Sequence, residues 1–597
     1  MRLFEAGFVT GLSLIGGDLV NYLIIVFLGL VVLFCILLIW NKRKQKRQIA
    51  ELVKESFGKP INLDEDKPDY RNERYMKHLS FYTRMQGSVL NDTTKGDIDF
   101  DKLFGKMNHT YSSVGEEYLY YVLSNPCTSY QQLDQREKII TYFQNNRALA
   151  IELQALFASI GKSKEVSMFQ YLEYLQSVEG KILKKHIFSL VGIIITIVLS
   201  IIQPKLGLVP MFVVIVTNVL TYWSNRQFAH SIMGSIRRLE SMIQVGVIVA
   251  RYEVEELQSF SERLESSSKF KNVLKNSDII FSEKTSLVGD ADALLDYIRM
   301  LTHFDYVKLY QIMDKLQEGY NELYNIVETL GELESLIAIA SFRESLEYYT
   351  VPILQQKEAI NVDSALGEGK LTEHNLFMEE LYHPLISNPV ANTLHTKQGV
   401  LLTGSNASGK STFLRTIAIN AICAQTIHTC FAKRYESYFY MVHSAMSLND
   451  SLENGDSYFI VEIETLRDIL NDYGDTPILC FVDEILRGTN TIERIAASTE
   501  TLRYMKNKGI LCFAASHDIE LTKLLIDEYD MYHFQEYIVD GQVDFDYILY
   551  PGPVTTRNAI RLLEVKGFDE IITNNAMDLI DYFDKYGEWP SASDFLT

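Results

Sequence analysis

Three long apolar segments constrain this chain more than any other feature of its sequence. The first runs from Asn21 to Trp40 and contains twenty residues without a charge. The second and third, Ile187–Ile202 and Leu206–Trp223, are separated by only three residues. A helix rises about 1.5 Å per residue, so the first segment is long enough to cross the ~30 Å hydrocarbon core of a bilayer. The sequence therefore predicts three transmembrane helices, the last two forming a hairpin.

Basic residues flank these segments unevenly. The first segment is preceded by one basic residue, Arg2, and followed by Lys42, Arg43, Lys44, Lys46 and Arg47. Because cytoplasmic flanks are rich in Lys and Arg, this asymmetry predicts an N-terminus outside the cell. The hairpin is flanked on both sides by basic residues, namely Lys181, Lys184, Lys185, Arg226, Arg237 and Arg238. We therefore expect a multi-pass protein of the cell membrane whose large soluble part faces the cytoplasm and which contacts membrane lipid.

Two other interpretations of the apolar segments stay open. The first segment could be a cleaved signal peptide, although the charges of a signal peptide precede its apolar stretch and that stretch is shorter. The hairpin could be two buried helices of a large soluble core, because its segments are near the lower length limit for spanning a bilayer. Core helices of this length usually show an amphipathic period, however, and this favours the membrane interpretation.

Composition limits the remaining function classes. The chain has 77 acidic and 56 basic residues, for a net charge of −21, so it lacks the overall positive charge of a protein that wraps polyanions. Any contact with nucleic acid must be local. The six cysteines show neither a CxxC pair nor a metal-ligand spacing: Cys35, Cys127, Cys423, Cys430, Cys480 and Cys512. The sequence therefore indicates neither a disulfide framework nor a zinc site.

The predicted secondary structure of the soluble part changes along the chain. Apolar residues at i, i+3 and i+4 spacing predict helices before and after the hairpin, and short β-rich runs alternate with helices from Val390 onward, as in a mainly parallel α/β domain. The predicted parts are a membrane anchor with its basic flank (1–47, span 21–40), a connector (48–96), a first helical core part (97–186), the transmembrane hairpin (187–223), a second helical core or lever part (224–375), the α/β domain (376–575) and a C-terminal tail (576–597).

A phosphate-binding motif lies in the α/β domain. The run from Gly404 to Ser411 matches the P-loop pattern, with a β-rich run before it and a helical run after it. Glycines let the backbone turn its N–H groups towards the phosphates. In such a loop Lys410 supplies a positive charge, and the Ser411 hydroxyl completes a Mg²⁺ coordination sphere.

Two later strand ends carry acid–base residues. An apolar strand, ILCFV, ends in Asp483 and Glu484, a Walker B arrangement in which the first carboxylate holds Mg²⁺ and the second polarises a water. His517 follows the next apolar strand and would face the γ-phosphate from that strand end. A lone histidine is as often structural, so both interpretations of His517 stay open at this point.

These motifs together carry a family resemblance. In order and spacing, GSNASGKST, DSLENGDSYFIVEIETLRDIL, DEILRGTNT and ASHDIELT resemble the nucleotide-binding domain of the MutS family, relatives of the ABC ATPases. The resemblance extends over roughly residues 75 to 575, excluding the hairpin. It implies an ABC-like α/β P-loop ATPase domain of MutS type, C-terminal to a mostly α-helical core.

The resemblance also implies roles for individual residues and the cofactors ATP and Mg²⁺. The nucleotide would be held by Gly404, Ser405, Asn406, Ala407, Ser408, Gly409, Lys410, Ser411 and Thr412. The metal would be bound by Ser411 and, through water, by Asp483. Glu484 would activate the attacking water and His517 would sense the γ-phosphate. Ser457 would reach the nucleotide of the opposite subunit, and the loop Arg487–Thr491 would line that interface, so a homodimer with two composite ATPase sites is implied.

Two functions from different classes remain. The N-terminal mismatch-recognition domain and the C-terminal nuclease module found in some relatives are not expected here. The chain is expected to be either a membrane-anchored, ATP-dependent DNA-binding protein related to mismatch repair, with double-stranded DNA as its partner, or a membrane ATPase that couples nucleotide-driven dimerisation to a protein or lipid partner without DNA. A DNA clamp would lose affinity steeply as salt rises, which separates the two.

Overall fold

A computed structural model gives the fold of most of the chain. It describes residues 29, 36–37, 40–41, 43–62, 72–163, 166–178, 181–274, 289–356, 375–405, 408–446, 458–472, 476–539, 542–554 and 559–590. The first predicted membrane segment, 21–40, lies outside the described residues except at four positions, and so does the predicted signature residue Ser457.

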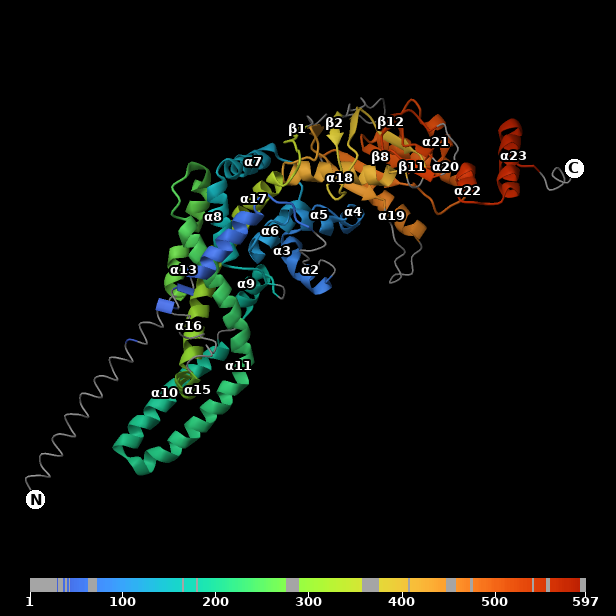
Figure 1. The fold of residues 1–597 in the computed structure, drawn as a ribbon. Coiled ribbons are helices and arrows are strands. Elements are labelled where there is room, and N and C mark those ends of the chain that lie inside the picture. Colours follow the sequence, from blue (N-terminus) through green and yellow to red (C-terminus); the bar gives the residue numbers. More distant parts are fainter. Residues whose placement is uncertain are drawn as a thin grey trace, which may run out of the picture.

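The described residues form an elongated molecule with three parts (Figure 1). A helical body lies in the middle, a long helical hairpin projects from one end, and an α/β domain lies at the other. The body contains α2 (Glu73–Leu79), α3 (Phe81–Gln86), α4 (Asp92–Asp97), α5 (Phe100–Met107), α6 (Ser113–Ser124), α7 (Tyr130–Asn145), α8 (Arg147–Ala158), α9 (Met168–Ser177), a 3₁₀ turn (Glu255–Leu257), α12 (Gln258–Leu264), α13 (Ser267–Leu274), α15 (Gly289–Thr302), α16 (Phe304–Glu318) and α17 (Tyr320–Glu344).

Helix α17 forms the centre of the body. All of its residues from Leu333 to Arg343 are buried, and it packs against α6, α7, α8, α9, α11, α12, α13 and α16. It approaches α6 most closely where Gly331 faces Val114. A Cβ added to Gly331 would lie 2.9 Å from both Cγ1 and the carbonyl oxygen of Val114. Two helices can come this close only where a side chain is missing.

A buried carboxylate fixes the register of this contact. Glu334 on α17 accepts hydrogen bonds from the backbone N–H groups of Tyr111 (2.5 Å) and Ser112 (2.9 Å) and from the Ser112 hydroxyl. These donors belong to the turn that begins α6, and a Cβ at Gly115 would overlap the same carboxylate. Burial raises the pKa of Glu334 to about 7.

The hairpin consists of α10 (Lys181–Ile202) and α11 (Pro204–Val249). Its spans Lys185–Ile202 and Pro204–Arg226 have mean hydropathies of 2.2 and 1.8, and only 17% and 11% of them are buried. By length and composition, each of these two helices could cross a membrane. Large apolar side chains such as Phe188 (77% exposed) and Val209 (70%) point outward. The interpretation of the hairpin as two helices inside a soluble core does not agree with this exposure.

A cluster of buried polar groups joins the hairpin to the body. The amide of Asn218 on α11 donates to the carbonyl of Leu301 on α15 at 2.7 Å. His186 on α10 and His303, which precedes α16, share a hydrogen bond of 2.7 Å between their Nδ1 atoms. Tyr222 on α11 donates to Asp305 on α16 at 2.9 Å. Polar groups on both hairpin helices are thus bound to the α15–α16 pair.

The α/β domain is built on a six-stranded sheet of order β12-β9-β4-β8-β7-β6, parallel except for β12. A second sheet, of order β1-β5-β2-β3, lies beside it. The elements are β1 (Ile353–Gln355), β2 (Leu376–Leu381), β3 (Asn392–Thr396), β4 (Val400–Thr403), α18 (Lys410–Thr426), β5 (Arg434–Tyr438), β6 (Met441–Ala445), α19 (Tyr458–Leu470), β7 (Ile478–Asp483), α20 (Thr491–Asn507), β8 (Leu511–Ala515), α21 (Ile519–Leu524), β9 (Asp530–His533), β10 (Glu536–Val539), β11 (Gln542–Phe545), β12 (Tyr550–Pro551), α22 (Ala559–Val565) and α23 (Glu570–Tyr586). The mainly parallel α/β fold predicted from the sequence is confirmed.

Three features differ from the sequence prediction. The segment 48–96, expected as a connector, contains helices that bury Leu79 and Tyr82 in the core, so that expectation is wrong for its described residues. The strand β1 pairs with β5 of the α/β domain, although it precedes residue 376. Helix α23 crosses the expected start of the tail at residue 576.

The close contact between α6 and α17 makes a stability prediction. Alanine is a better helix former than glycine by about 1 kcal/mol, so Gly234→Ala on α11, where a Cβ meets nothing within 4 Å, should leave the unfolding temperature unchanged or raise it. Gly331→Ala should instead destabilise the protein by about 1–3 kcal/mol, because Val114 must move. Thermal unfolding of both variants in detergent measures this difference. Equal unfolding temperatures for the two variants would contradict the close packing.

Candidate active site

The P-loop connects β4 to the N-terminus of α18. Gly404 and Gly409 have φ values of 135° and 106°, a left-handed region that favours glycine. A Cβ at Gly404 would also lie 2.6 Å from the carbonyl oxygen of Phe534. At the N-cap of α18, Gly409, no side chain makes a capping hydrogen bond among the described residues, as an anion site at a helix N-terminus requires.

Lys410 lies inside this loop. Its side chain is buried, and its ammonium donates to the carbonyl oxygens of Gly404 and Ser405, both at 2.7 Å. The Ser405 hydroxyl donates to Glu536 on β10 at 2.5 Å. Burial lowers the pKa of Lys410 to about 8, partly opposed by the carboxylates of Asp483, Glu484 and Glu536.

The neighbouring strand ends bring the predicted acid–base residues to the loop. The Ser411 hydroxyl donates a short hydrogen bond to Oδ2 of Asp483, the last residue of β7. His517 follows β8, which lies between β4 and β7, and its Nε2 is 3.4 Å from Nζ of Lys410. The three strand ends therefore bring these side chains to the P-loop at one edge of the parallel sheet, while their catalytic roles stay predictions.

Glu484 occupies a constrained position at this edge. Its φ is 55°, and that of Leu486 is 56°, a region that non-glycine residues rarely adopt and that is often found at functional sites. Its carboxylate lies 2.8 Å from Nη1 of Arg487 and 3.1 Å from Nε2 of His517. The N–H of Leu486 donates to the buried carboxylate of Glu462 on α19, which holds the strained turn in place.

The environment shifts the pKa values of these groups in opposite directions. Burial raises the pKa of Asp483, although Ser411 and Lys410 oppose the shift. Burial alone would also raise the pKa of Glu484, but the Arg487 hydrogen bond and the nearby His517 lower it below its usual range. Burial and the Lys410 charge lower the pKa of His517. At neutral pH the site therefore holds an ionised Glu484 beside a neutral imidazole, as general-base chemistry requires.

A cavity next to the P-loop was not predicted from the sequence. It has a volume of about 320 Å³ and is lined by His383, Val390, Gly409, Thr412, Phe534 and Tyr547, among others. Asn392 holds one wall, because its amide donates to the carbonyl of Tyr547 at 3.0 Å and accepts from the N–H of Leu549 at 2.8 Å. The residues come from distant parts of the chain, and of those named only Gly409 and Thr412 belong to a local sequence motif, the P-loop.

The other predicted site residues fall into two groups. Ser408 is buried, with its hydroxyl donating to the Ser405 carbonyl at 2.8 Å, and Thr412 lines the cavity. Asn406, Ala407 and Ser457 lie outside the described residues, so their predicted roles stay predictions.

The residues present fit a magnesium-bound nucleotide. The Ser411 hydroxyl and the Asp483 carboxylate are hard oxygen ligands already in contact, which is the donor type that Mg²⁺ prefers. A glycine-lined loop at a helix N-terminus, on a parallel strand flanked by acidic and histidine strand ends, defines the class of P-loop nucleotide-binding proteins.

Comparison with known proteins shows similarity to one family. Residues 400–584 match the family model described as MutS domain V. An alignment with the DNA mismatch repair protein MutS of Natronomonas pharaonis is 24% identical and covers 52% of this chain and 35% of that protein. MutS of Halalkalibacterium halodurans is 26% identical over 49% of the chain and 35% of the relative, and the human MutS protein homolog 4 is 25% identical over 42% and 26%. These matches support membership of the MutS family, and the aligned part spans only about a third or less of the length of these relatives.

The buried lysine makes a prediction about pH. In the free protein the pKa of Lys410 is about 8. Nucleotide phosphates would stabilise the ammonium form and raise this pKa, so ATP binding at a pH of about 8.5 should take up a fraction of a proton, and affinity should fall as the pH rises. Calorimetry in two buffers of different ionisation enthalpy measures the uptake. Lys410→Ala should abolish binding, whereas Lys433→Ala, at an exposed ion pair with Glu380, should leave the uptake unchanged. An ATP affinity that does not change with pH would contradict the proposed contact between Lys410 and the phosphates.

Proposed function

We propose that this protein is a membrane-anchored ATPase that binds and hydrolyses ATP with Mg²⁺ and works as a homodimer. The observation that carries the proposal is the meeting of four groups at one sheet edge: Lys410, the Ser411–Asp483 pair, Glu484 and His517. Membership of the MutS family supports it. The matched relatives are longer than this chain, so the activity is proposed from the site itself.

Each group has a role that its position supports. The N–H groups at the start of α18 and the Lys410 ammonium would bind the β- and γ-phosphates. Ser411 and Asp483 would hold Mg²⁺, which neutralises charge on the phosphate oxygens when bound. Glu484 would accept a proton from the attacking water, and His517 would hold that water near the γ-phosphate. The cavity lined by Phe534 and Tyr547 would take the nucleobase, because apolar and aromatic walls suit a flat ring.

The homodimer is supported by exposed apolar surface on the α/β domain. Ile460 and Ile463 on α19 are about two-fifths exposed, and Ile492 on α20 is 83% exposed. A groove of about 560 Å³ between these helices is lined by residues such as Phe459, Leu486 and Tyr504. Apolar area of this kind marks protein–protein contact surfaces. A second copy on this face would meet the loop Arg487–Thr491 and the start of α19.

The membrane anchor is supported by the exposed apolar surface of the hairpin. Its two spans have high hydropathy and little burial. Trp223 and Arg226 stack at 5.0 Å at the end of the second span, where aromatic and basic side chains commonly meet the lipid headgroups. We place the hairpin and the segment 21–40 in the cell membrane, with the N-terminus outside and the ATPase domain in the cytoplasm.

The catalytic assignment predicts a separation of binding from hydrolysis. Glu484→Gln should still bind ATP but lose hydrolysis by about 10²-fold or more, because the general base is removed. Phosphate release and ATP binding by the full chain in detergent, with and without Mg²⁺, measure both properties. Glu500→Gln, at an exposed carboxylate on α20, is the matched control and should hydrolyse ATP normally. Normal hydrolysis by Glu484→Gln would refute the role of this residue.

A second candidate function is ATP-dependent binding of double-stranded DNA. It is favoured by the names of the relatives, two of which are DNA mismatch repair proteins. The net charge of −21 does not favour it, and the basic run 42–47 is as well explained by anionic lipid. We therefore propose the ATPase function without DNA binding.

The two functions differ in their response to duplex DNA and salt. A protein that neutralises 6–10 phosphates loses about 10³-fold or more in affinity between roughly 50 and 200 mM salt. We expect the ATPase rate of the purified protein to be the same with no DNA, with homoduplex and with mismatched duplex. Stimulation by either duplex, together with steeply salt-dependent binding, would instead establish the DNA-binding function.

A further inference from the structure

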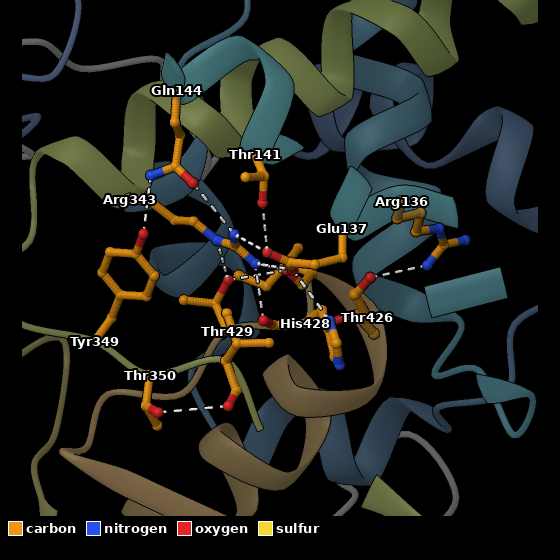
Figure 2. Close-up of polar contacts among 12 residues, drawn as sticks. Arg136, Glu137, Thr141, Gln144, Arg343, Tyr349, Thr350, Thr426, His428 and Thr429 are labelled. Atoms are coloured by element: carbon orange, nitrogen blue, oxygen red, sulfur yellow. Dashed lines mark hydrogen bonds and ion pairs between the residues drawn. The ribbon is translucent and has the colours of Figure 1, made fainter. Parts of the chain in front are cut away.

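Arg343 is a fully buried arginine in the last turn of α17. Its side chain has no exposed surface, and each of its three nitrogens has a hydrogen-bond acceptor (Figure 2). The acceptors come from two other elements, namely α7 and the segment directly after α18. The guanidinium thus lies where the helical body and the α/β domain meet.

One side of the guanidinium binds the C-terminal end of α18. Nε donates to the hydroxyl of Thr429 at 2.8 Å, and Nη2 donates to the carbonyl oxygens of His428 at 2.8 Å and Ile427 at 3.3 Å. From α7, Arg136 donates to the carbonyl of Thr426 at 2.8 Å. The last carbonyls of a helix have no partner within the helix, and cations are favoured there by the helix dipole. These contacts therefore fix the end of α18 to the body.

The other side of the guanidinium binds α7. Nη1 and Nη2 form a two-pronged ion pair with the Glu137 carboxylate at 2.8 and 2.6 Å. The same carboxylate lies 3.0 Å from Nδ1 of His428 and accepts from the Thr141 hydroxyl at 3.0 Å. Glu137 therefore links α7 to both α17 and the end of α18. Although burial opposes it, the hydrogen bonds from Arg343 and His428 lower the pKa of Glu137 to about 2.

Helix α18 connects this cluster to the proposed nucleotide site. The helix begins at Lys410 and Ser411, in the P-loop, and ends one residue before Ile427. Its seventeen residues extend over about 25 Å, and most of them are buried. A buried helix moves as a rigid unit, because its packed side chains cannot shift separately. A displacement at the P-loop is thus carried to the residues that Arg343 binds.

From Arg343 the contacts continue to the hairpin. Helix α17 packs against α11 and α16, and α16 packs against α10. Tyr306 on α16 donates to the carbonyl of Tyr222 on α11 at 3.0 Å, and the Tyr222 hydroxyl donates back to Asp305. The chain of contacts from the P-loop to the hairpin is therefore continuous and passes through Arg343.

We propose that Arg343, held by Glu137 and His428, is the positioning residue that couples the nucleotide state of the P-loop to the helical body and the membrane hairpin. This inference rests on the proposed ATPase function. Apolar side chains at this place would hold the three helices together equally firmly. The hydrogen bonds of the cluster are directional, however, so they select one arrangement of α7, α17 and α18 over others. Loss of the guanidinium should therefore separate nucleotide binding from the response of the body.

Amide hydrogen exchange of the full chain in detergent tests the coupling. Glu484→Gln serves as the parent, so that added ATP persists, and exchange is compared without nucleotide and with ATP and Mg²⁺. In the parent, ATP should change exchange in α7, α17 and α10–α11 by about fivefold or more, the usual lower range of coupling between sites. In the Arg343→Met variant of the parent, ATP should still protect the P-loop, but the change in α17 and the hairpin should disappear.

Matched variants distinguish coupling from general destabilisation. Arg263 on α12 also pairs with a carboxylate of α17, Glu332 at 2.7 Å, but has no contact with α18 among the described contacts. Arg263→Met should keep the full ATP response. Glu137→Gln and Arg343→Lys retain most of the side-chain volume. If Arg343→Met does not fold, these two variants test the coupling in its place. Both should weaken the response, because neither keeps the two-pronged ion pair.

The outcomes separate the coupling from the function on which it rests. If the parent does not bind ATP, both the proposed function and the coupling are wrong. If the parent binds ATP but its body shows no response, or if folded Arg343 and Glu137 variants respond as fully as the parent, the coupling alone is wrong. Loss of the response in these variants, with ATP binding and the Arg263→Met response intact, supports it.

Discussion

The packing of α17 is the constraint on which the other described elements depend. The eleven residues from Leu333 to Arg343, which precede the last residue of the helix, are all buried. A helix segment that is buried around its whole circumference has no exposed face and serves as the centre of a core. The surrounding helices are therefore positioned relative to α17, and α17 cannot shift without repacking them. This makes the helical body a unit that moves as a whole.

Two buried ionisable residues on α17 give this packing its register. Glu334 binds the turn that starts α6, and Arg343, nine residues later, binds α7 and the end of α18. Burying a charge costs free energy unless hydrogen bonds compensate, so each residue is tolerated in one arrangement of its partners only. The apolar contacts of α17 thus supply stability. The Glu334 contact sets α17 against α6, and the Arg343 contact sets α17 against the α/β domain.

The sequence predicted those features that depend on neighbours along the chain. The P-loop, the Asp483–Glu484 strand end and the hairpin are each contained in a short segment, and parallel-sheet topology alone brings His517 to the same edge. The connector over 48–96 was wrong because helices of six or seven residues are marginal alone and form here through burial of Leu79 and Tyr82. The Glu137–Arg343 pair joins residues 206 apart with no local pattern, so only the tertiary structure reveals it.

The unbroken length of α11 determines what the hairpin can do. An anchor on a flexible linker would hold a protein at the bilayer, but movement of the protein would not be transmitted to that anchor. Helix α11 instead continues for 46 residues, from the tip of the hairpin to the body. From Pro210, which removes a helix hydrogen bond near the tip, to Val249 it extends over about 60 Å. For a rigid rod of that length, a rotation of about 10° at the body moves the far end by about 10 Å. Small rearrangements around α17 are therefore sufficient to tilt the hairpin appreciably. The contacts between α17 and the end of α18 thus matter for the far end of the hairpin.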